Sequence, residues 1–236
     1  MTLRMTVSTL SDNDAILSAL DSFDISGGTS FSEEEELILE NFVLLERYNY
    51  LKDDSNNKEL LRSSLKAQKE KCDAWLKANK KEVPNKWLCV TYADTISCYI
   101  SFSVSDVIKY GLSIKDYYLK AYAQDENTSY VLTNLAQWYY WAPKLNGGSK
   151  KKAGDYFEKA VKAARTDAER YFADIFLSQY LFETGDKGRS ATLLREAKSY
   201  CPESHYVALI EGANKDGLSF FAWSKKHSSM DGKPED

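Results

Sequence analysis

Two glutamines of this 236-residue chain share a spacing that suits ligand binding. Gln137 is followed three residues later by Tyr140, and Gln179 is followed three residues later by Phe182. Residues at this distance in an α-helix lie one turn apart on the same side. A glutamine side chain both donates and accepts hydrogen bonds, and an aromatic ring offers flat apolar area at small entropic cost. The two pairs therefore suit a peptide, or a small organic molecule with one polar end.

Four aromatic residues follow one another from Trp138 to Trp141. Successive residues of a helix are about 100° apart around its axis, so four large rings cannot all face one neighbouring helix. Some of these rings must line an open surface, or fill space against other helices of a closed bundle. The sequence leaves both alternatives open for Trp138 and Trp141.

The chain carries no residue pattern typical of catalysis or of metal binding. Its four cysteines form no C-x-x-C pair and its two histidines lie far apart, so no zinc site is predicted. Gly147–Lys150 lacks the residue order of a phosphate loop, and we expect a turn followed by a helix N-cap. Asp94 and Asp106 lie in a mostly apolar segment without a histidine or nucleophile motif nearby. We therefore expect no enzymatic activity, no cofactor and no metal.

Charge and hydropathy exclude two further classes of function. A formal net charge of -4 provides no basic surface, so we expect no nucleic-acid binding. No apolar run approaches the roughly 18 residues that span a bilayer. The first ten residues also lack the apolar centre of a signal peptide. As it stands, the chain is expected to be cytoplasmic.

The elements that must position these side chains are helices. Four prolines and eleven glycines favour long helices over a β-rich fold with many turns. Apolar residues at helical spacing, with capping and stop signals, predict about nine helices and no strand. Polar, glycine-containing or proline-containing turns separate them at 52–57, 80–85, 142–148, 185–186 and 201–202.

A similar packing signature recurs in three of these helices. Positions four and then three residues apart fall on one helix face, where small residues beside a large one let a second helix approach closely. The copies end at Ala121, Ala160 and Ala197, which are 39 and 37 residues apart. They consist of Ile114, Tyr118 and Ala121; Ala153, Phe157 and Ala160; and Ser190, Leu194 and Ala197.

The last two copies resemble tetratricopeptide repeats, whose period is 34 residues. Ser178 precedes the final copy and Pro202 follows it at the offsets this family uses, with Gly185 in the turn. The copy before it departs by an insertion of about five residues at 142–148. The resemblance covers 86–202 and implies an all-α fold, a right-handed superhelix of antiparallel helix pairs.

The insertion also resembles a narrower family. Pro143, the pair Gly147 and Gly148, and then Ala153 and Phe157 are similar to the T component of bacterial TRAP transporters. That resemblance implies a periplasmic lipoprotein, its leader removed, with a hydrophobic pore for a small organic ligand and a transporter subunit as partner. The chain departs from this family in lacking a lipobox and in being rather short.

The tetratricopeptide resemblance also implies a binding surface, because the first helix of each pair lines the concave side in that family. We therefore expect a scaffold protein that engages a peptide or protein partner in a concave aromatic groove. The alternative is the transporter-associated carrier, in which the same rings would be enclosed. An enzyme would instead need a buried carboxylate pair, and a structural oligomer an apolar convex face. The expected groove residues are Tyr130, Thr133, Gln137, Tyr140, Trp141, Phe172, Ile175, Gln179 and Phe182.

These patterns divide the chain into four expected segments. Residues 1–30 are expected to form a flexible N-terminal segment, and 31–85 a set of capping helices. Residues 86–226 would hold the tetratricopeptide-like repeats. The hydrophilic residues 227–236 would form a frayed tail.

Overall fold

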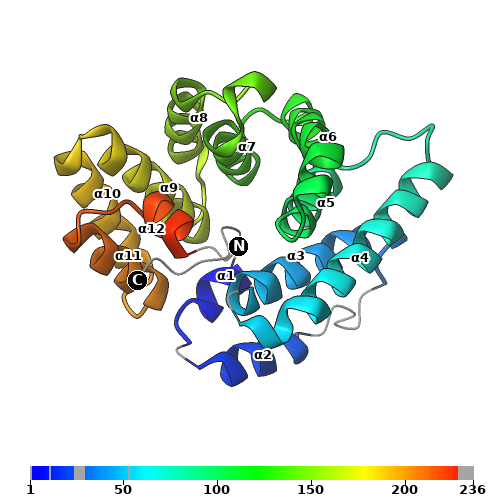
Figure 1. Cartoon of the computed structure of the whole chain (residues 1–236), viewed down its shortest axis with the longest axis horizontal. Coiled ribbons are helices and arrows are strands. Elements are labelled where there is room, and N and C mark those ends of the chain that lie inside the picture. The colour runs from blue at the N-terminus through cyan, green and yellow to red at the C-terminus, as the bar shows by residue number, and fades with distance from the viewer. Residues whose placement is uncertain (1, 11, 24–29, 53, 228–236) are drawn as a thin grey trace. The chain divides into compact units, whose positions relative to one another are not determined.

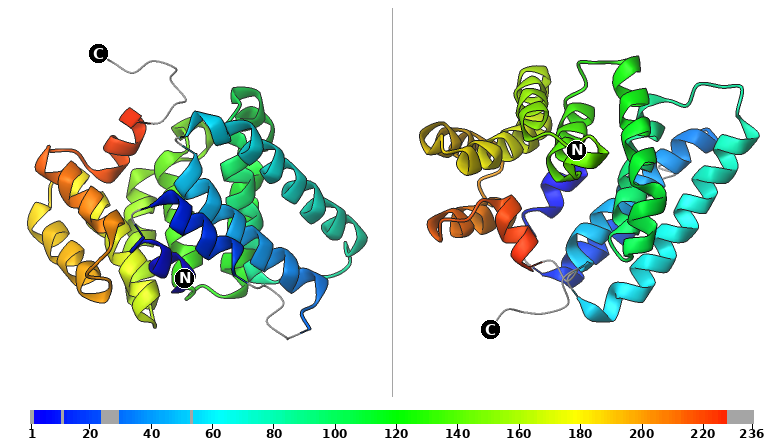
Figure 2. Two further views of the ribbon diagram at one scale, coloured as in Figure 1. Left: turned by 90° about the horizontal axis from the view of Figure 1, so that it is seen from below. Right: turned by 45° about the horizontal axis from the view of Figure 1, so that its top comes forward.

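The computed structural model describes residues 2–10, 12–23, 30–52 and 54–227. These residues form twelve α-helices and no strand, so the expected all-α class is confirmed (Figures 1 and 2). The number of helices exceeds the expected nine. Two of the additional helices lie before residue 30, and a third results from a break in the expected helix at 203–224.

Contacts divide the chain into two compact units. The N-terminal unit comprises residues 13–126, and the C-terminal unit comprises residues 1–12 and 127–236. The boundary expected between residues 85 and 86 therefore falls inside the N-terminal unit. The reason is the apolar helix α5 (Lys86–Ile100), which packs against three other helices of that unit.

The N-terminal unit consists of five α-helices, of which α5 is the most buried. Residues on all sides of α5 are buried, because its sequence is apolar around the whole helix circumference. Ser32 caps α3 through a capping box with Glu35, as the acidic first turn predicts. The other helices of the unit are α2 (Asn13–Asp21), α3 (Glu33–Leu51), α4 (Lys58–Ala78) and α6 (Val104–Gln124).

The helix expected over 86–109 ends early, at Ile100. The Ser101 hydroxyl donates a 2.6 Å hydrogen bond to the backbone oxygen of Cys98, which competes with continuation of the helix. The next helix, α6, then begins at Val104 rather than near residue 113. Gly111 lies inside α6, because a single glycine in open space costs only about 1 kcal/mol relative to alanine.

Part of the N-terminal segment is helical, although its polar composition predicts a flexible segment. It forms α1 (Thr2–Val7) and α2, and their residues Val7, Ile16 and Leu20 are buried. The glycine joint expected near residue 27 and the tail after residue 227 lie outside the described residues.

The C-terminal unit contains two helix hairpins followed by two shorter helices. Helix α7 (Ser129–Trp141) packs against α8 (Lys150–Ala163), and α9 (Asp167–Thr184) packs against α10 (Lys187–Tyr200). Helices α11 (His205–Lys215) and α12 (Phe220–His227) follow, and α1 also belongs to this unit. The signature residues Ala153, Phe157 and Ala160 are fully buried, as their spacing predicts.

The insertion between α7 and α8 is a tight turn. Gly147 has a φ of 91°, which favours glycine. A Cβ on Gly148 would lie only 1.8 Å from the Ala142 backbone oxygen, so a side chain there would need the turn to move. The Ser149 hydroxyl accepts a hydrogen bond from the Lys152 amide and caps α8. The expectation of a turn and N-cap is confirmed.

Candidate binding site

All nine expected groove residues lie on α7 and α9, and these two helices contact each other. We use the term α7–α9 surface for the part of these helices formed by Tyr130, Gln137, Tyr140, Trp141, Phe172, Phe176 and Gln179. Most of the nine expected residues are not open to solvent. Ile175 and Gln179 are fully buried, whereas Trp141 remains 48% exposed. Two terminal helices, α1 and α12, contact α9.

Helix α1 covers the end of the surface formed by the first turns of α7 and α9. The Arg4 guanidinium carbon lies 5.9 Å from the ring centroid of Tyr130 and 5.2 Å from that of Phe172. Such distances allow cation–π attraction. Ser8, just after α1, accepts a 2.9 Å hydrogen bond at its backbone oxygen from the amide of His205. Tyr130 and Phe172 are both buried, and Phe172 also belongs to a core cluster with residues of α10 and α11.

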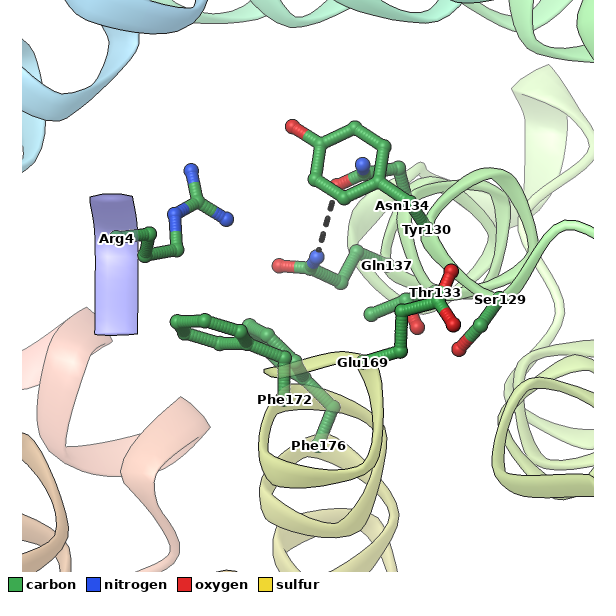
Figure 3. A pocket seen from close by; sticks show the side chains of 9 residues that line it. All are labelled: Arg4, Ser129, Tyr130, Thr133, Asn134, Gln137, Glu169, Phe172 and Phe176. Carbon is green, nitrogen blue, oxygen red and sulfur yellow. Dashed lines mark hydrogen bonds between the residues drawn. The ribbon is translucent and has the colours of Figure 1, made fainter. Parts of the chain in front are cut away.

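A small hollow remains between α1, α7 and α9. Figure 3 shows Arg4 facing Tyr130, Gln137 and Phe172 across it. The Gln137 amide donates a 3.2 Å hydrogen bond to Oδ1 of Asn134. The hollow has a volume of about 10 Å³. This is close to the least space that can hold one water molecule. Thr133 also lines the hollow, as the expected register implies.

Helix α12 covers the other end of the surface through Phe221. The Phe221 side chain is 2% exposed, and its ring centroid lies 4.4 Å from that of Tyr140. The Trp141 and Phe176 rings lie at 5.9 Å and 6.3 Å from it. Phe157 of α8 lies behind them at 6.2 Å. Phe221 is therefore the centre of an aromatic cluster, where offset and edge contacts add to the burial of apolar area.

Polar side chains of α9 hold the start of α12. Oε1 of Gln179 accepts a 2.7 Å hydrogen bond from the backbone amide of Phe220. Glu183 Oε2 accepts a 3.0 Å hydrogen bond from the hydroxyl of Ser219. Because the first amides of a helix lack partners within the helix, such side chains satisfy groups that would otherwise be orphaned.

Glu183 also accepts hydrogen bonds from side chains of α7 and α8. Its carboxylate accepts a hydrogen bond from the Tyr140 hydroxyl and one of 2.6 Å from Nζ of Lys150. Burial raises the pKa of Glu183, but the hydrogen bonds from Lys150, Tyr140 and Ser219 outweigh it and leave the pKa below its ordinary value. Glu183 is thus ionised at neutral pH and joins four segments of the unit.

The two glutamines that look equivalent in sequence have different surroundings. Gln179 is fully buried beneath α12, whereas Gln137 is half-buried at the hollow. Ile175 belongs to the core cluster with Tyr171 and Leu194 and therefore packs the interior. Phe182 lies beyond the surface, where Nζ of Lys187 is 4.2 Å from its ring centroid.

Sequence reasoning did not find α12 as a separate element. The expected helix at 203–224 breaks at Gly217, whose φ of +79° favours glycine. The Leu218 amide donates a 2.9 Å hydrogen bond back to the Ala213 oxygen, as in a Schellman C-cap. Gly217 followed by the capping residue Ser219 is the sequence signal for this break.

The described residues contain no group of three or more histidine, cysteine, aspartate or glutamate side chains placed to hold a metal ion. Asp174 of α9 is buried, and its burial, together with the charge of Glu196, raises its pKa to about 7. Glu196 itself is exposed on α10, so the two do not form a buried carboxylate pair. Over the same part of the chain, no helix is both long and apolar enough to cross a membrane.

No protein-family model matches this chain, and a search among curated proteins finds no match. Inferences about function therefore depend on the residues and contacts described above.

Proposed function

We propose that this chain is a non-enzymatic binding or scaffold protein that engages a peptide or protein partner at the α7–α9 surface. In this proposal the α7–α8 and α9–α10 hairpins are tetratricopeptide-like pairs of a right-handed superhelix, with α7 and α9 on its concave side. The observation that carries the proposal is α12. Phe221 and the backbone amide of Phe220 bind this surface as the helix of a partner would.

A protein partner is better supported than a small organic ligand. Pockets for drug-sized ligands have volumes of roughly 300–1,000 Å³, whereas the hollow beside Arg4 measures about 10 Å³. Trp141, which a closed pore would enclose, is 48% exposed. Under the resemblance to the T component of TRAP transporters, a transporter subunit in a bacterial periplasm would be one such partner.

Site-specific photocrosslinking tests the proposal. The crosslinking amino acid p-benzoylphenylalanine replaces Trp141 in one variant and Thr192, exposed on α10, in a control variant. We expect a defined partner protein to crosslink from position 141 and not from position 192. The purified partner should then bind the parent chain at least tenfold more tightly than Trp141→Ala. Absence of crosslinks from position 141, or identical products from both positions, would contradict the proposal.

Native mass spectrometry tests the small-ligand alternative on the freshly purified chain. We expect the native and denatured masses to agree. An additional mass of a few hundred daltons that is lost on denaturation would instead support the carrier.

A further inference from the structure

Helix α12 departs from the pairing of the helices before it. Helices α8 and α10 lie along α7 and α9, whereas α12 is a short helix that contacts both α9 and α11, the latter through the rings of Phe220 and Tyr206 at 5.1 Å. After the break at Gly217, α12 also reaches the α7–α9 surface and places Phe221 there. Helix α12 therefore occupies the α7–α9 surface while it also packs against α11.

The contacts of α12 define what this surface recognises. The hydroxyl of Ser219 caps α12 by accepting a 3.0 Å hydrogen bond from the Ala222 amide, and it also donates to Glu183. The amide of Phe220, the first residue of α12, donates to Gln179. Phe221, the second residue, enters the aromatic cluster. The α7–α9 surface thus binds the N-terminus of a helix that has a hydroxyl residue as its N-cap and a phenylalanine as its second residue.

Few side chains of α12 are fully buried. Phe221 is the one buried side chain among the eight residues of this helix. Isolated helices of this length are marginal in water, so α12 depends on its contacts with α7, α9 and α11. Residues 216–219 connect it to α11, and the Leu218 amide and the Ser219 hydroxyl of this link donate hydrogen bonds to Ala213 and Glu183.

We propose that α12 is an exchangeable occupant of the α7–α9 surface, and that the partner presents a helix with the same start. That helix has Ser or Thr as its N-cap and Phe at its second position, and it displaces α12 when it binds. This inference depends on the proposed function, because it names the chemistry of the partner at the same surface. The chain then exists in a closed form, with α12 bound, and in an open form that accepts the partner.

A peptide competition experiment on the full-length chain tests the exchange. The probe is a fluorescein-labelled peptide with the sequence of residues 216–227, and its anisotropy reports binding. Full-length Phe221→Ala should bind the probe at least tenfold more tightly than the parent, because its own α12 no longer competes. Equal affinity for the two chains, or binding to neither, would overturn the proposal.

Three variants serve as controls for the specificity of probe binding. A probe carrying Phe221→Ala should bind neither chain. Adding Gln179→Leu to the Phe221→Ala chain should weaken probe binding at least tenfold, since the acceptor for the helix amide is lost. Adding Thr192→Ala, at an exposed position on α10, to the Phe221→Ala chain should leave its affinity for the probe unchanged. Loss of binding in the Thr192 variant would assign the signal to nonspecific association and overturn the exchange.

The parent chain provides a second test if Phe221→Ala does not fold. An excess of unlabelled probe should accelerate hydrogen exchange of the α12 amides in the parent chain and leave those of α10 unchanged. Ser219→Ala, which removes only a hydroxyl, should make the same exchange faster without the probe. Unchanged exchange of α12 in both measurements would overturn the inference. If position 141 still crosslinks a partner in that case, the proposed function stands and only the exchange fails.

Discussion

One helix interface in each unit illustrates a different chemistry of packing. In the C-terminal unit, α8 meets its neighbours through the buried residues Ala153, Phe157 and Ala160. In the N-terminal unit, α3, α4 and α5 meet around the buried amide of Asn41. This amide donates a 3.1 Å hydrogen bond to Thr91 Oγ1 and accepts one of 3.0 Å from Gln68 Nε2.

The difference shows what each kind of interface requires of a sequence. Contacts built from small and large apolar residues need a fixed spacing on one helix face, so they leave a repeated pattern. A buried polar network needs partners from different helices, and its energetic value depends on all of them being satisfied. Such a network leaves no periodic signal, although it specifies its interface strictly. Variants of each interface test this comparison.

Phe157→Ala should cause the largest loss of stability. Phe157 is fully buried and contacts the rings of Phe176, Tyr180 and Phe221, so its removal leaves a cavity between three helices. We expect a loss of about 3–5 kcal/mol in the free energy of unfolding, measured by urea denaturation. The half-buried Phe182→Ala is the control and should lose about 1 kcal/mol or less. Similar losses in both variants would contradict the importance of the packing signature.

Asp174→Asn should reveal the effect of a buried carboxylate in the C-terminal unit. No hydrogen bond from the described residues reaches the buried Asp174 carboxylate, and its pKa is raised to about 7. The folded state therefore binds this proton more tightly than the unfolded state does. The contribution of Asp174 to stability is complete below about pH 4 and is lost as the pH rises to about 7.

The asparagine variant cannot ionise and should not show this loss. We expect it to be more stable than the parent by about 3 kcal/mol at pH 8 and nearly equal to it at pH 4. Urea denaturation at both pH values measures the difference. Asp155→Asn, at an exposed position on α8, is the control and should change neither value. A constant difference between parent and Asp174→Asn at the two pH values would show that titration of Asp174 is not its cause.

Asn41→Leu should test the polar interface of the N-terminal unit. It removes an acceptor from Gln68 and a donor to Thr91, and Gln68 is then buried without that partner. Because an unsatisfied buried polar group costs about 1–3 kcal/mol, we expect a loss in that range by urea denaturation. Adding Gln68→Leu should recover part of it. If the double variant loses the sum of both single losses, the network is not cooperative.

The fold was predictable from the sequence where packing or capping leaves a pattern. The hairpins between residues 129 and 200 follow from the buried signatures and from caps such as Ser149 and Gly185. The all-α class follows from the same signals. The division into two units was not predictable in this way. It depends on which faces of α5 contact other helices, and α5 has no polar side that would indicate them.

The candidate site was predictable only in part. The spacing of Gln179, Tyr140 and Trp141 placed them on helices that do contact each other. It could not indicate that Phe221 lies against the two rings, because that contact joins residues about 80 positions apart in the chain through a helix break. Ile175 has the periodicity of a surface position and is nevertheless buried, since the core cluster of α9, α10 and α11 encloses it.

Trp141→Ala should have the smallest effect on stability and a distinct effect on binding. Trp141 is 48% exposed and touches the Phe221 ring at one edge, so we expect a loss of about 1 kcal/mol or less in the free energy of unfolding. In the full-length Phe221→Ala chain, however, the same change should weaken binding of the 216–227 probe about tenfold. Aromatic residues at the centre of a contact often carry that much binding energy.

Trp138→Ala is the matched control within the same aromatic run. The Trp138 ring makes an edge contact with the ring of Tyr139, which is buried between helices. Removing the Trp138 side chain should therefore reduce stability more than Trp141→Ala does. It should leave probe affinity unchanged, because its ring contacts the packing side of α7. If Trp138→Ala weakens the probe and Trp141→Ala does not, the binding side of α7 is the opposite one. Loss of stability in Trp141→Ala without loss of probe binding would make Trp141 a packing residue and leave Gln179 and Tyr140 as the recognition elements of the surface.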